Sequence, residues 1–283
     1  MKKLNGHKKQ IALYSSLKWT SIVSAVVALT ALAAIILFVL IRGTGKLNAQ
    51  LLFGKYGEYP SILPAFLGTL QLIFIAGAVA VPIGIASAVF LVEYTDNKSK
   101  TVKLIRVATE TLAGIPSIVY GLFGYLVFVV ALKWGYSLLG GGLTLAVMIL
   151  PVIVRSTEES LLAVPSGFRE GSYALGTSKV RTIFKVVLPS ASGGIVTSVI
   201  LAIGRVVSES AVLILTIGMV VNKIPNSFMS PGTSLALDVY YFGSHGYPDE
   251  AAATAVVLLL FVIVLNLLAA GLGRLLKRKT GDI

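Results

Sequence analysis

PSGFREGSYALGTSKVRTIFKVVLP, residues Pro165 to Pro189, is the long polar stretch between two strongly apolar segments of the chain. It divides at Gly176 into two short helical patterns. Ser166 and Thr177 are the expected N-caps of the two helices, and Gly176 is the expected left-handed stop between them. Leu188-Pro189 is expected to end the second helix. The stretch therefore predicts a helix–turn–helix held between two membrane segments.

Two uses of such a helix pair are compatible with its periodicity. Small residues in the first helix, Gly171, Ser172 and Ala174, would let another protein approach its backbone closely. Alternatively, the pair lies on lipid headgroups as an amphipathic element. The second helix carries an apolar stripe with basic residues off it. The stripe is Val180, Ile183, Phe184 and Val187, and the basic residues are Lys179, Arg181 and Lys185.

Composition places the chain among integral membrane proteins. Of its 283 residues, 56% are hydrophobic and 13% are charged, whereas soluble domains carry about 25% charged residues. The net charge of +12 is not a nucleic-acid footprint, because the charges sit between apolar runs without interleaved aromatic residues. The absence of cysteine excludes disulfides and thiolate chemistry. His7 and His245 lie far apart without partners at ligand spacing, so no metal site is expected.

Six apolar segments are long enough to cross a bilayer. They are residues 20–41, 63–92, 111–132, 137–154, 192–220 and 251–272. The first is too long for the apolar region of a secretory signal, so it is expected to remain as a span. In the second, small residues recur every four positions, which predicts close helix packing. The predicted fold is all-α and polytopic, with a tail at 1–19, a membrane domain at 20–272 and a second tail at 273–283.

The lysines and arginines are distributed unevenly between the two sides of this arrangement. The side that holds both termini, the loop 93–110 and the loop 155–189 carries 18 of the 24, and the other side carries 5. Cytoplasmic loops carry such an excess of Lys and Arg. Both termini and the central loop are therefore predicted to be cytoplasmic, which an even number of spans requires.

Charged residues inside the fifth segment are the candidate transport site. Arg205 and Glu209 are four residues apart and are expected to share one helix face. An arginine in mid-span costs about 2.5–3.5 kcal/mol, so it should face protein or a water-filled path. One interpretation is an ion pair that locks two helices together. The other is a lining for an oxyanion, because the planar guanidinium fork matches phosphate. Glu110, at the mouth of the third segment, is interpreted as a helix-terminus carboxylate, with a transport residue as the alternative.

The polar stretch resembles the EAA loop of ABC-importer permeases, which docks on a separate ATPase. The matching residues are Glu170, Gly171, Ser172, Gly176, Val186, Leu188 and Pro189, in a loop taken as 155–190. Gly-Ser stands where that family usually has Ala-Ala, and Val186 stands where it has Ile. The resemblance implies a docking role and a coupling helix pair.

Three further stretches, 110–124, 150–165 and 199–218, resemble the PstA family of bacterial phosphate ABC-importer permeases, and the similarity extends over about 63–275. Around its acid this family usually reads Gly-Glu-Thr, where this chain has Ser208-Glu209-Ser210. The resemblance implies a plasma (inner) membrane protein that moves phosphate. Its implied partners are a PstC-type permease, a PstB-type ATPase dimer that binds ATP, and an external PstS-type receptor. It also implies no cofactor, metal or catalytic residue in this chain.

Several other functions remain open at this point. The sister PstC permease is similar in sequence, and a permease for molybdate or sulfate would share the same architecture. An ion-coupled secondary carrier is disfavoured, because the chain has no convincing internal repeat and has an ATPase-docking loop. A membrane enzyme is disfavoured, because no metal, nucleophile–base or paired-acid constellation is present.

Overall fold

The computed structural model describes the backbone of residues 2–54, 56–57, 60–96 and 99–280, and the side chains between residues 14 and 273 within them. All regular structure in these ranges is helical. The α-helices are α1 (Lys2–Thr44), α2 (Ala49–Phe53), α3 (Leu63–Val89), α4 (Lys100–Ala113), α5 (Ser117–Gly124), α6 (Leu138–Leu162), α7 (Ser166–Ala174), α8 (Lys179–Thr182), α9 (Leu188–Val207), α10 (Ala211–Thr216), α11 (Leu235–Ser244) and α12 (Pro248–Thr280). Three π-helical segments, η1 (Phe90–Tyr94), η2 (Tyr125–Ala131) and η3 (Ile183–Val187), continue α3, α5 and α8.

Five helical runs are long and apolar enough to cross a membrane. They are Tyr14–Thr44, Leu63–Tyr94, Leu138–Leu162, Lys179–Val207 and Pro248–Gly273. A sixth crossing is made only if α4 and the α5–η2 segment, which meet at 97°, are counted as one broken span. The predicted all-α, polytopic fold is therefore confirmed, and the predicted number of six spans is reached if this bent pair crosses as one span.

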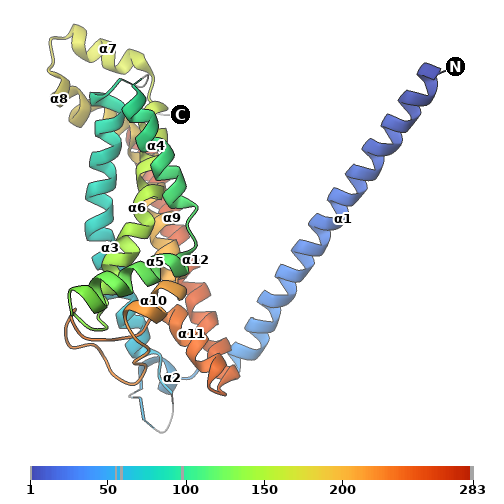
Figure 1. Ribbon diagram of the computed structural model, residues 1–283, viewed down its shortest axis with the longest axis vertical. Coiled ribbons are helices and arrows are strands. Elements are labelled where there is room, and N and C mark those ends of the chain that lie inside the picture. Colours follow the sequence, from blue (N-terminus) through green and yellow to red (C-terminus); the bar gives the residue numbers. More distant parts are fainter. Residues whose placement is uncertain (1, 55, 58–59, 97–98, 281–283) are drawn as a thin grey trace.

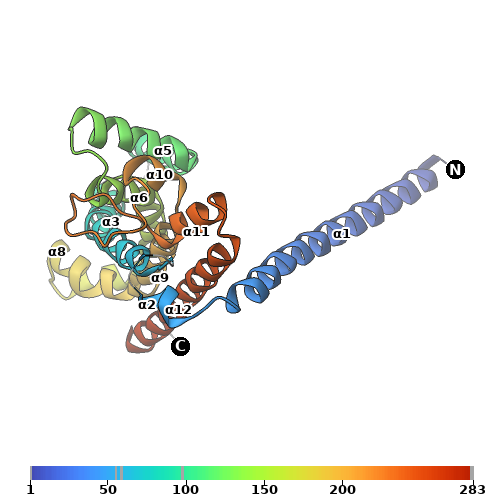
Figure 2. The same ribbon diagram turned by 90° about the horizontal axis from the view of Figure 1, so that it is seen from below.

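Helix α1 extends away from the bundle formed by the other helices, as Figures 1 and 2 show. It contacts the bundle at the start of α12, where a Cβ on Gly43 would lie 2.5 Å from the carbonyl oxygen of Ala252. Arg42 forms an ion pair with Asp249 at the same place. Asp249 and Glu250 stand in the first turn of α12, where they complement the helix dipole.

Helix α6 packs between α3 and α9 and carries much of the core. The predicted small-residue stripe of α3 is buried, with Ala76, Ala80, Gly84 and Ala88 all inside. A Cβ on Gly84 would come within 2.6 Å of the Ile153 side chain, so glycine there allows the close approach of α6. Packing is therefore the role of this stripe, as predicted.

The third predicted segment, 111–132, is not one helix. Helix α4 begins earlier, at Lys100, and ends at Ala113, and the chain turns before α5 starts at Ser117. Pro116 lacks an N–H group and disfavours helical geometry at the residue before it, so the helix cannot pass through this point. The Tyr120 hydroxyl donates a hydrogen bond of 2.7 Å to the Leu112 carbonyl and bridges the break.

The fifth predicted segment, 192–220, is shifted toward the N-terminus. Its helical run begins at Lys179 and ends at Val207, so the expected stop at Leu188-Pro189 is wrong. The N–H of Leu188 donates to Ile183 in π-helical fashion, and Pro189 follows in the first turn of α9, where its missing N–H has no lost partner. The second half of the polar stretch is thus continuous with a membrane span.

Helices α7 and α8, the N-terminal end of α1 and the C-terminal end of α12 lie toward one end of the molecule, and α2 and α11 lie toward the other (Figure 1). The segment between the last two spans, 221–250, contains the short helix α11. It is more deeply buried than an amphipathic surface helix, because Leu235, Leu237 and Phe242 have no exposed surface.

Candidate transport path and coupling loop

Helix α9 ends at Val207, two residues after Arg205, within the predicted fifth segment. Ser208 is the C-cap, and its hydroxyl donates to the carbonyl oxygens of Gly204 and Arg205 at 3.1 and 3.2 Å. Glu209 lies in the break, and its Oε1 accepts a hydrogen bond of 3.4 Å from the N–H of Val212 in α10. The segment is therefore a discontinuous helix, with a cation in its last turn and a carboxylate capping the next helix.

Arg205 and Glu209 do not form the predicted pair on one helix face. The i,i+4 relation requires a continuous helix, and the backbone leaves helical geometry between them. Among the described residues no carboxylate lies within 4.0 Å of the Arg205 guanidinium. Arg205 is half-buried, and a Cβ on Gly204 would meet nothing within 4 Å, so the helix face beside the arginine is open. The ion-pair interpretation is therefore wrong for this structure.

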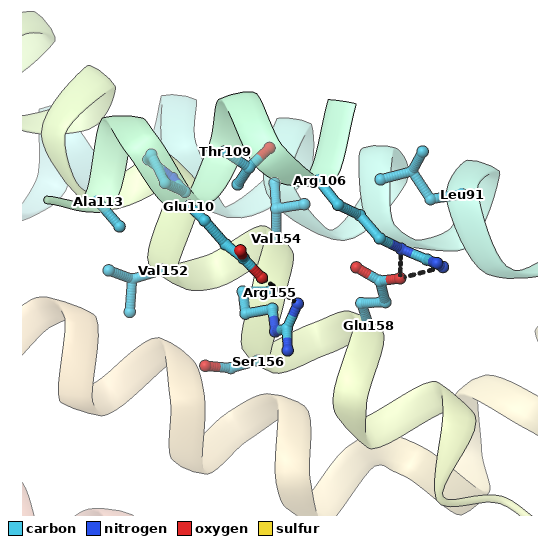
Figure 3. Close-up of a pocket in the computed structure, with 11 residues that line it drawn as sticks. Leu91, Arg106, Thr109, Glu110, Ala113, Val152, Val154, Arg155, Ser156 and Glu158 are labelled. Atoms are coloured by element: carbon cyan, nitrogen blue, oxygen red, sulfur yellow. Dashed lines mark hydrogen bonds and ion pairs between the residues drawn. The ribbon is translucent and has the colours of Figure 1, made fainter. Parts of the chain in front are cut away.

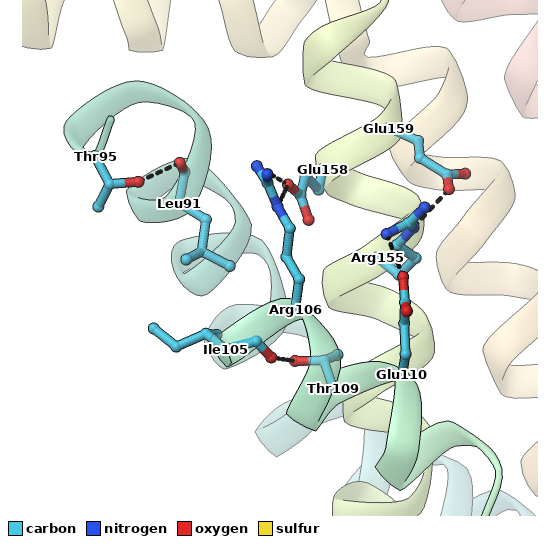
Figure 4. A network of polar contacts seen from close by, with 9 residues as sticks. All are labelled: Leu91, Thr95, Ile105, Arg106, Thr109, Glu110, Arg155, Glu158 and Glu159. Carbon is cyan, nitrogen blue, oxygen red and sulfur yellow. Dashed lines mark hydrogen bonds and ion pairs between the residues drawn. The ribbon is translucent and has the colours of Figure 1, made fainter. Parts of the chain in front are cut away.

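A second group of charged residues, here called the α4–α6 cluster, joins α4 to α6 (Figure 4). Arg106 donates from Nε to Oε1 of Glu158 at 2.6 Å, and the Glu158 side chain is only 5% exposed. Arg155 donates to Glu110 at 2.9 Å and to Glu159 at 2.7 Å. The cluster thus sets two guanidinium groups against three carboxylates.

A cavity of about 190 Å³ lies within this cluster, and Figure 3 shows the side chains around it. The charged residues that line it, Arg106, Glu110, Arg155 and Glu158, pair with one another, so the cavity offers no uncompensated positive charge to an anion. Glu110 stands in the last turn of α4, where the dipole disfavours a negative charge. Glu110 is thus a helix-terminus carboxylate, as interpreted, but it stands at the C-terminal end of α4, and Arg155 on α6 compensates its charge.

The spacing of charged residues in the sequence indicates part of this cluster. Arg106 and Glu110 are four residues apart, and so are Arg155 and Glu159, which is the spacing of side chains on one helix face. Partner choice across helices could not be predicted, because Arg106 binds Glu158 on α6 and not Glu110 on its own helix.

The coupling loop is a helix pair, as predicted, with Gly176 at φ +74° between α7 and α8. Two expected caps are wrong by one residue: Pro165 precedes α7, and Ser178 caps α8 by accepting a hydrogen bond from the N–H of Arg181. The loop exposes apolar side chains, and Leu175 is 85% exposed. These are Phe168, Tyr173, Leu175, Val180 and Phe184.

Three hydroxyl groups hold the two helices of the loop together. The Ser172 oxygen lies 2.6 Å from that of Thr177 and 2.9 Å from that of Thr182, and the two threonine oxygens are 3.0 Å apart. Ser172 and Thr182 are buried. Ser172 stands where the EAA pattern usually has alanine. Its hydroxyl forms hydrogen bonds with Thr177 and Thr182 that an alanine could not form. Beside it, a Cβ on Gly171 would meet nothing within 4 Å, and Glu170 is exposed.

An ion pair between Arg169 and Glu93 anchors the loop to η1, the segment that continues α3. Arg169 in α7 donates to Oε1 of Glu93 at 2.7 Å, and it also donates to the carbonyl oxygens of Val164 and Leu161 at 2.9 and 3.0 Å. The Glu93 side chain is 5% exposed and the Arg169 side chain 19%. Sequence reasoning missed this contact, because its two residues are 76 positions apart.

Comparison with known proteins now identifies the class. The chain belongs to the family described as binding-protein-dependent transport system inner membrane component, whose sequence pattern matches residues 80–282. With its several apolar helices it is a multi-pass permease subunit of an ABC importer.

The chain is similar to several named proteins of this kind. It is 34% identical over 261 residues to the probable ABC transporter permease protein YqgI of Bacillus subtilis, covering 86% of this chain and 88% of that protein. It is 35% identical over 246 residues to the phosphate transport system permease protein PstA of Pasteurella multocida, covering 83% and 85%. It is also 36% identical over 211 residues to PstA 1 of Mycobacterium tuberculosis strain H37Rv, covering 73% and 67%.

Two solved structures share the fold. One is a bacterial alginate ABC transporter in complex with an alginate-bound periplasmic protein, with a TM-score of 0.70 at 14% identity, covering 97% of this chain and 96% of that chain. The other is the inward-facing MetNI methionine ABC transporter, with a TM-score of 0.64 at 22% identity, covering 76% and 95%. They support the ABC-importer permease fold and carry no information on the substrate here.

Proposed function

We propose that this chain is a PstA-type subunit that moves inorganic phosphate through the plasma membrane of a bacterium. The observation that carries the proposal is Arg205, a half-buried cation at a break in a membrane-spanning helix, without a carboxylate of the described residues within 4.0 Å. A guanidinium presents donors in a fork that matches phosphate oxygens. The PstA proteins similar over most of the chain support phosphate as the substrate.

Arg205, Ser208 and Glu209 form the proposed phosphate path. Arg205 attracts the anion, and Ser208 lies exposed one turn away. Glu209 caps α10 and keeps a negative charge close by, so the anion is not held too tightly to leave. We assign Glu110 to the α4–α6 cluster, where it fixes α4, and not to phosphate contact.

The proposed driving subunit is a PstB-type ATPase dimer that binds ATP and docks on the coupling loop. The other proposed partners are a PstC-type permease and an external PstS-type receptor. The loop is continuous with α6 and α9 and is tied to η1, the continuation of α3, by Arg169 and Glu93. A movement of α7 would therefore reach three spans together, as rocking-bundle transport requires. We propose that both termini lie in the cytoplasm, as the uneven distribution of Lys and Arg predicts.

Phosphate uptake by cells that lack their own phosphate permease tests the substrate. Expression with the partner subunits should restore uptake, and excess molybdate or sulfate should not compete. Competition by either would indicate a permease for another oxyanion. That candidate is kept because the relative YqgI is named only as an ABC transporter permease. The purified chain alone is expected neither to bind nor to hydrolyse ATP, and turnover in a preparation free of other subunits would contradict this.

The docking role of the coupling loop is tested by Gly176→Val. Gly176 has φ +74°, and a side chain in this region is strained by about 1–2 kcal/mol, which should tilt α7 against α8. Uptake should fall while the protein remains in the membrane. Gly167→Val, at an exposed glycine of α7 without positive φ, is the control. Normal uptake and ATPase association in Gly176→Val would reject this role.

A further inference from the structure

An apolar groove of about 440 Å³ runs between the ends of two membrane-spanning runs. One wall is formed by α3 and η1, and the other by η3 and the start of α9. The Tyr94 hydroxyl is the only polar side-chain group among the lining residues. The lining residues are Pro82, Ile85, Ala86, Val89, Phe90, Tyr94, Ile183, Phe184 and Leu188. Phe90 is 55% exposed and Phe184 63%, so the groove opens to the outside of the bundle.

The mouth of the groove carries a positive charge. Nζ of Lys179 lies 5.0 Å from the centroid of the Tyr94 ring, and this ring stacks against Phe90. Lys179 has no carboxylate within 4.0 Å among the described residues. A cation–π contact orients the ammonium group without neutralising it, so Lys179 remains able to attract an anion at the end of an apolar channel.

We propose that this groove binds an anionic phospholipid, with an acyl chain along the apolar walls and the phosphate group at Lys179. The proposal rests on the proposed function in one respect: the coupling loop places Lys179 on the cytoplasmic side, where the leaflet is rich in anionic lipids. A tyrosine beside a lysine at the end of a span is typical of the membrane–water interface. The acyl chain would contact Ile183 and Phe184, which lie directly before α9. The occupancy of the groove by lipid would therefore depend on the position of the coupling loop.

Native mass spectrometry of the delipidated complex of this chain with its partner subunits tests the proposal. Phosphatidylglycerol and phosphatidylcholine are titrated separately, and bound lipids are counted. Wild-type complex should bind one phosphatidylglycerol in preference to phosphatidylcholine. Lys179→Gln should weaken phosphatidylglycerol binding about fivefold, the effect of one lysine near an anionic surface, and should leave phosphatidylcholine unchanged. The control is Lys103→Gln, an exposed lysine at the start of α4.

Ala86→Phe fills the groove and should remove that one lipid, whereas Ala108→Phe, at an exposed alanine of α4, should not. A photoreactive amino acid in place of Phe184 should cross-link to lipid. Equal binding of both lipids, an unchanged count in Lys179→Gln and Ala86→Phe, or a cross-link to a protein subunit would each overturn the proposal. Lipid binding is counted without transport, so a complex that prefers phosphatidylglycerol yet carries another oxyanion would reject the proposed substrate alone.

Discussion

The arginines of the α4–α6 cluster are paired with carboxylates of the described residues, whereas Arg205, at the break between α9 and α10, is not. In the cluster, Arg106 and Arg155 each contact glutamate oxygens at 2.6–2.9 Å. At the break, Arg205 has no carboxylate of the described residues within 4.0 Å, and Glu209 accepts a hydrogen bond from the α10 backbone instead.

This difference in pairing distinguishes arginines that stabilise the fold from an arginine whose charge is available to a ligand. A charge inside the membrane is costly unless it is paired or faces water. The cluster meets this requirement inside the protein and fixes α4 against α6. No carboxylate of the described residues neutralises Arg205, and the proposed function assigns its donors to a transported oxyanion. The predictions below test whether this separation holds.

The largest expected effect is on Arg205→Gln. This variant keeps polar donors but removes the charge, so phosphate uptake should fall about 100-fold, as for the loss of one oriented electrostatic contact. Assembly with the ATPase should be unchanged, because no ion pair of Arg205 is broken. Uptake of labelled phosphate, normalised to assembled complex, is the measurement.

The double variant Arg205→Gln, Glu209→Gln decides between transport and structure. If the two charges only stabilised each other, removing both would restore uptake. We expect the double variant to assemble, because a glutamine at 209 keeps the oxygen that caps α10. We expect it still to fail to transport, because the positive charge that attracts phosphate is absent. Near-normal uptake by the double variant would reject the assignment of Arg205 to the phosphate path.

The second largest expected effect is a loss of stability caused by Glu158→Gln. Its carboxylate is almost fully buried and contacts the Arg106 guanidinium, so the substitution removes the negative charge from a buried ion pair. Removing one partner of a buried pair costs about 3–5 kcal/mol, and the low end applies here because Arg106 is 23% exposed. The melting temperature of the purified complex should fall. Uptake per remaining complex should stay normal, and a selective loss of uptake would move the cluster into the transport path.

Asp238 differs from both groups of charges, because its buried carboxyl is expected to be protonated and therefore neutral. Burial raises the pKa of this α11 carboxyl to about 8, although the hydrogen bond from Thr233 lowers it. Its Oδ2 has no hydrogen-bond partner among the described residues. The folded protein holds the proton up to about pH 8, whereas the unfolded chain loses it near 3.8. Stability should therefore fall as pH rises between these values and level off above them.

Asp238→Asn tests this by removing the titration while keeping an oxygen for Thr233. The melting temperature of the variant should not show this part of the pH dependence. The melting temperature of the variant relative to that of the wild type should therefore increase as pH rises toward about 8. Identical pH profiles of the two proteins would show that Asp238 is ionised in the fold.

The sequence predicted the spans better than their interruptions, for physical reasons. Apolar runs such as 251–272 are decisive, because only a helix satisfies its backbone within lipid. The break at Ser208-Glu209-Ser210 was missed, because each of these residues is tolerated inside helices and the break depends on packing of α10 against α5. Gly176 was predicted correctly, because a left-handed turn follows from local chemistry. Contacts such as Arg169 with Glu93 join distant segments, and periodicity within one helix cannot reveal them.

The smallest expected effect is on Glu159→Gln, next to Glu158 in the sequence. Both residues accept a hydrogen bond from an arginine, but the Glu159 side chain is 62% exposed and its partner Arg155 is 47% exposed. Exposed pairs contribute about 0–1 kcal/mol, because solvent screens the charges. Arg155 also keeps Glu110 in this variant. Melting temperature and uptake should therefore stay close to wild type, and the loss in Glu158→Gln should exceed that in Glu159→Gln. If the order were reversed, exposure would not be what separates the two carboxylates, and Arg155 would need to be considered, like Arg205, as a group that meets the transported anion.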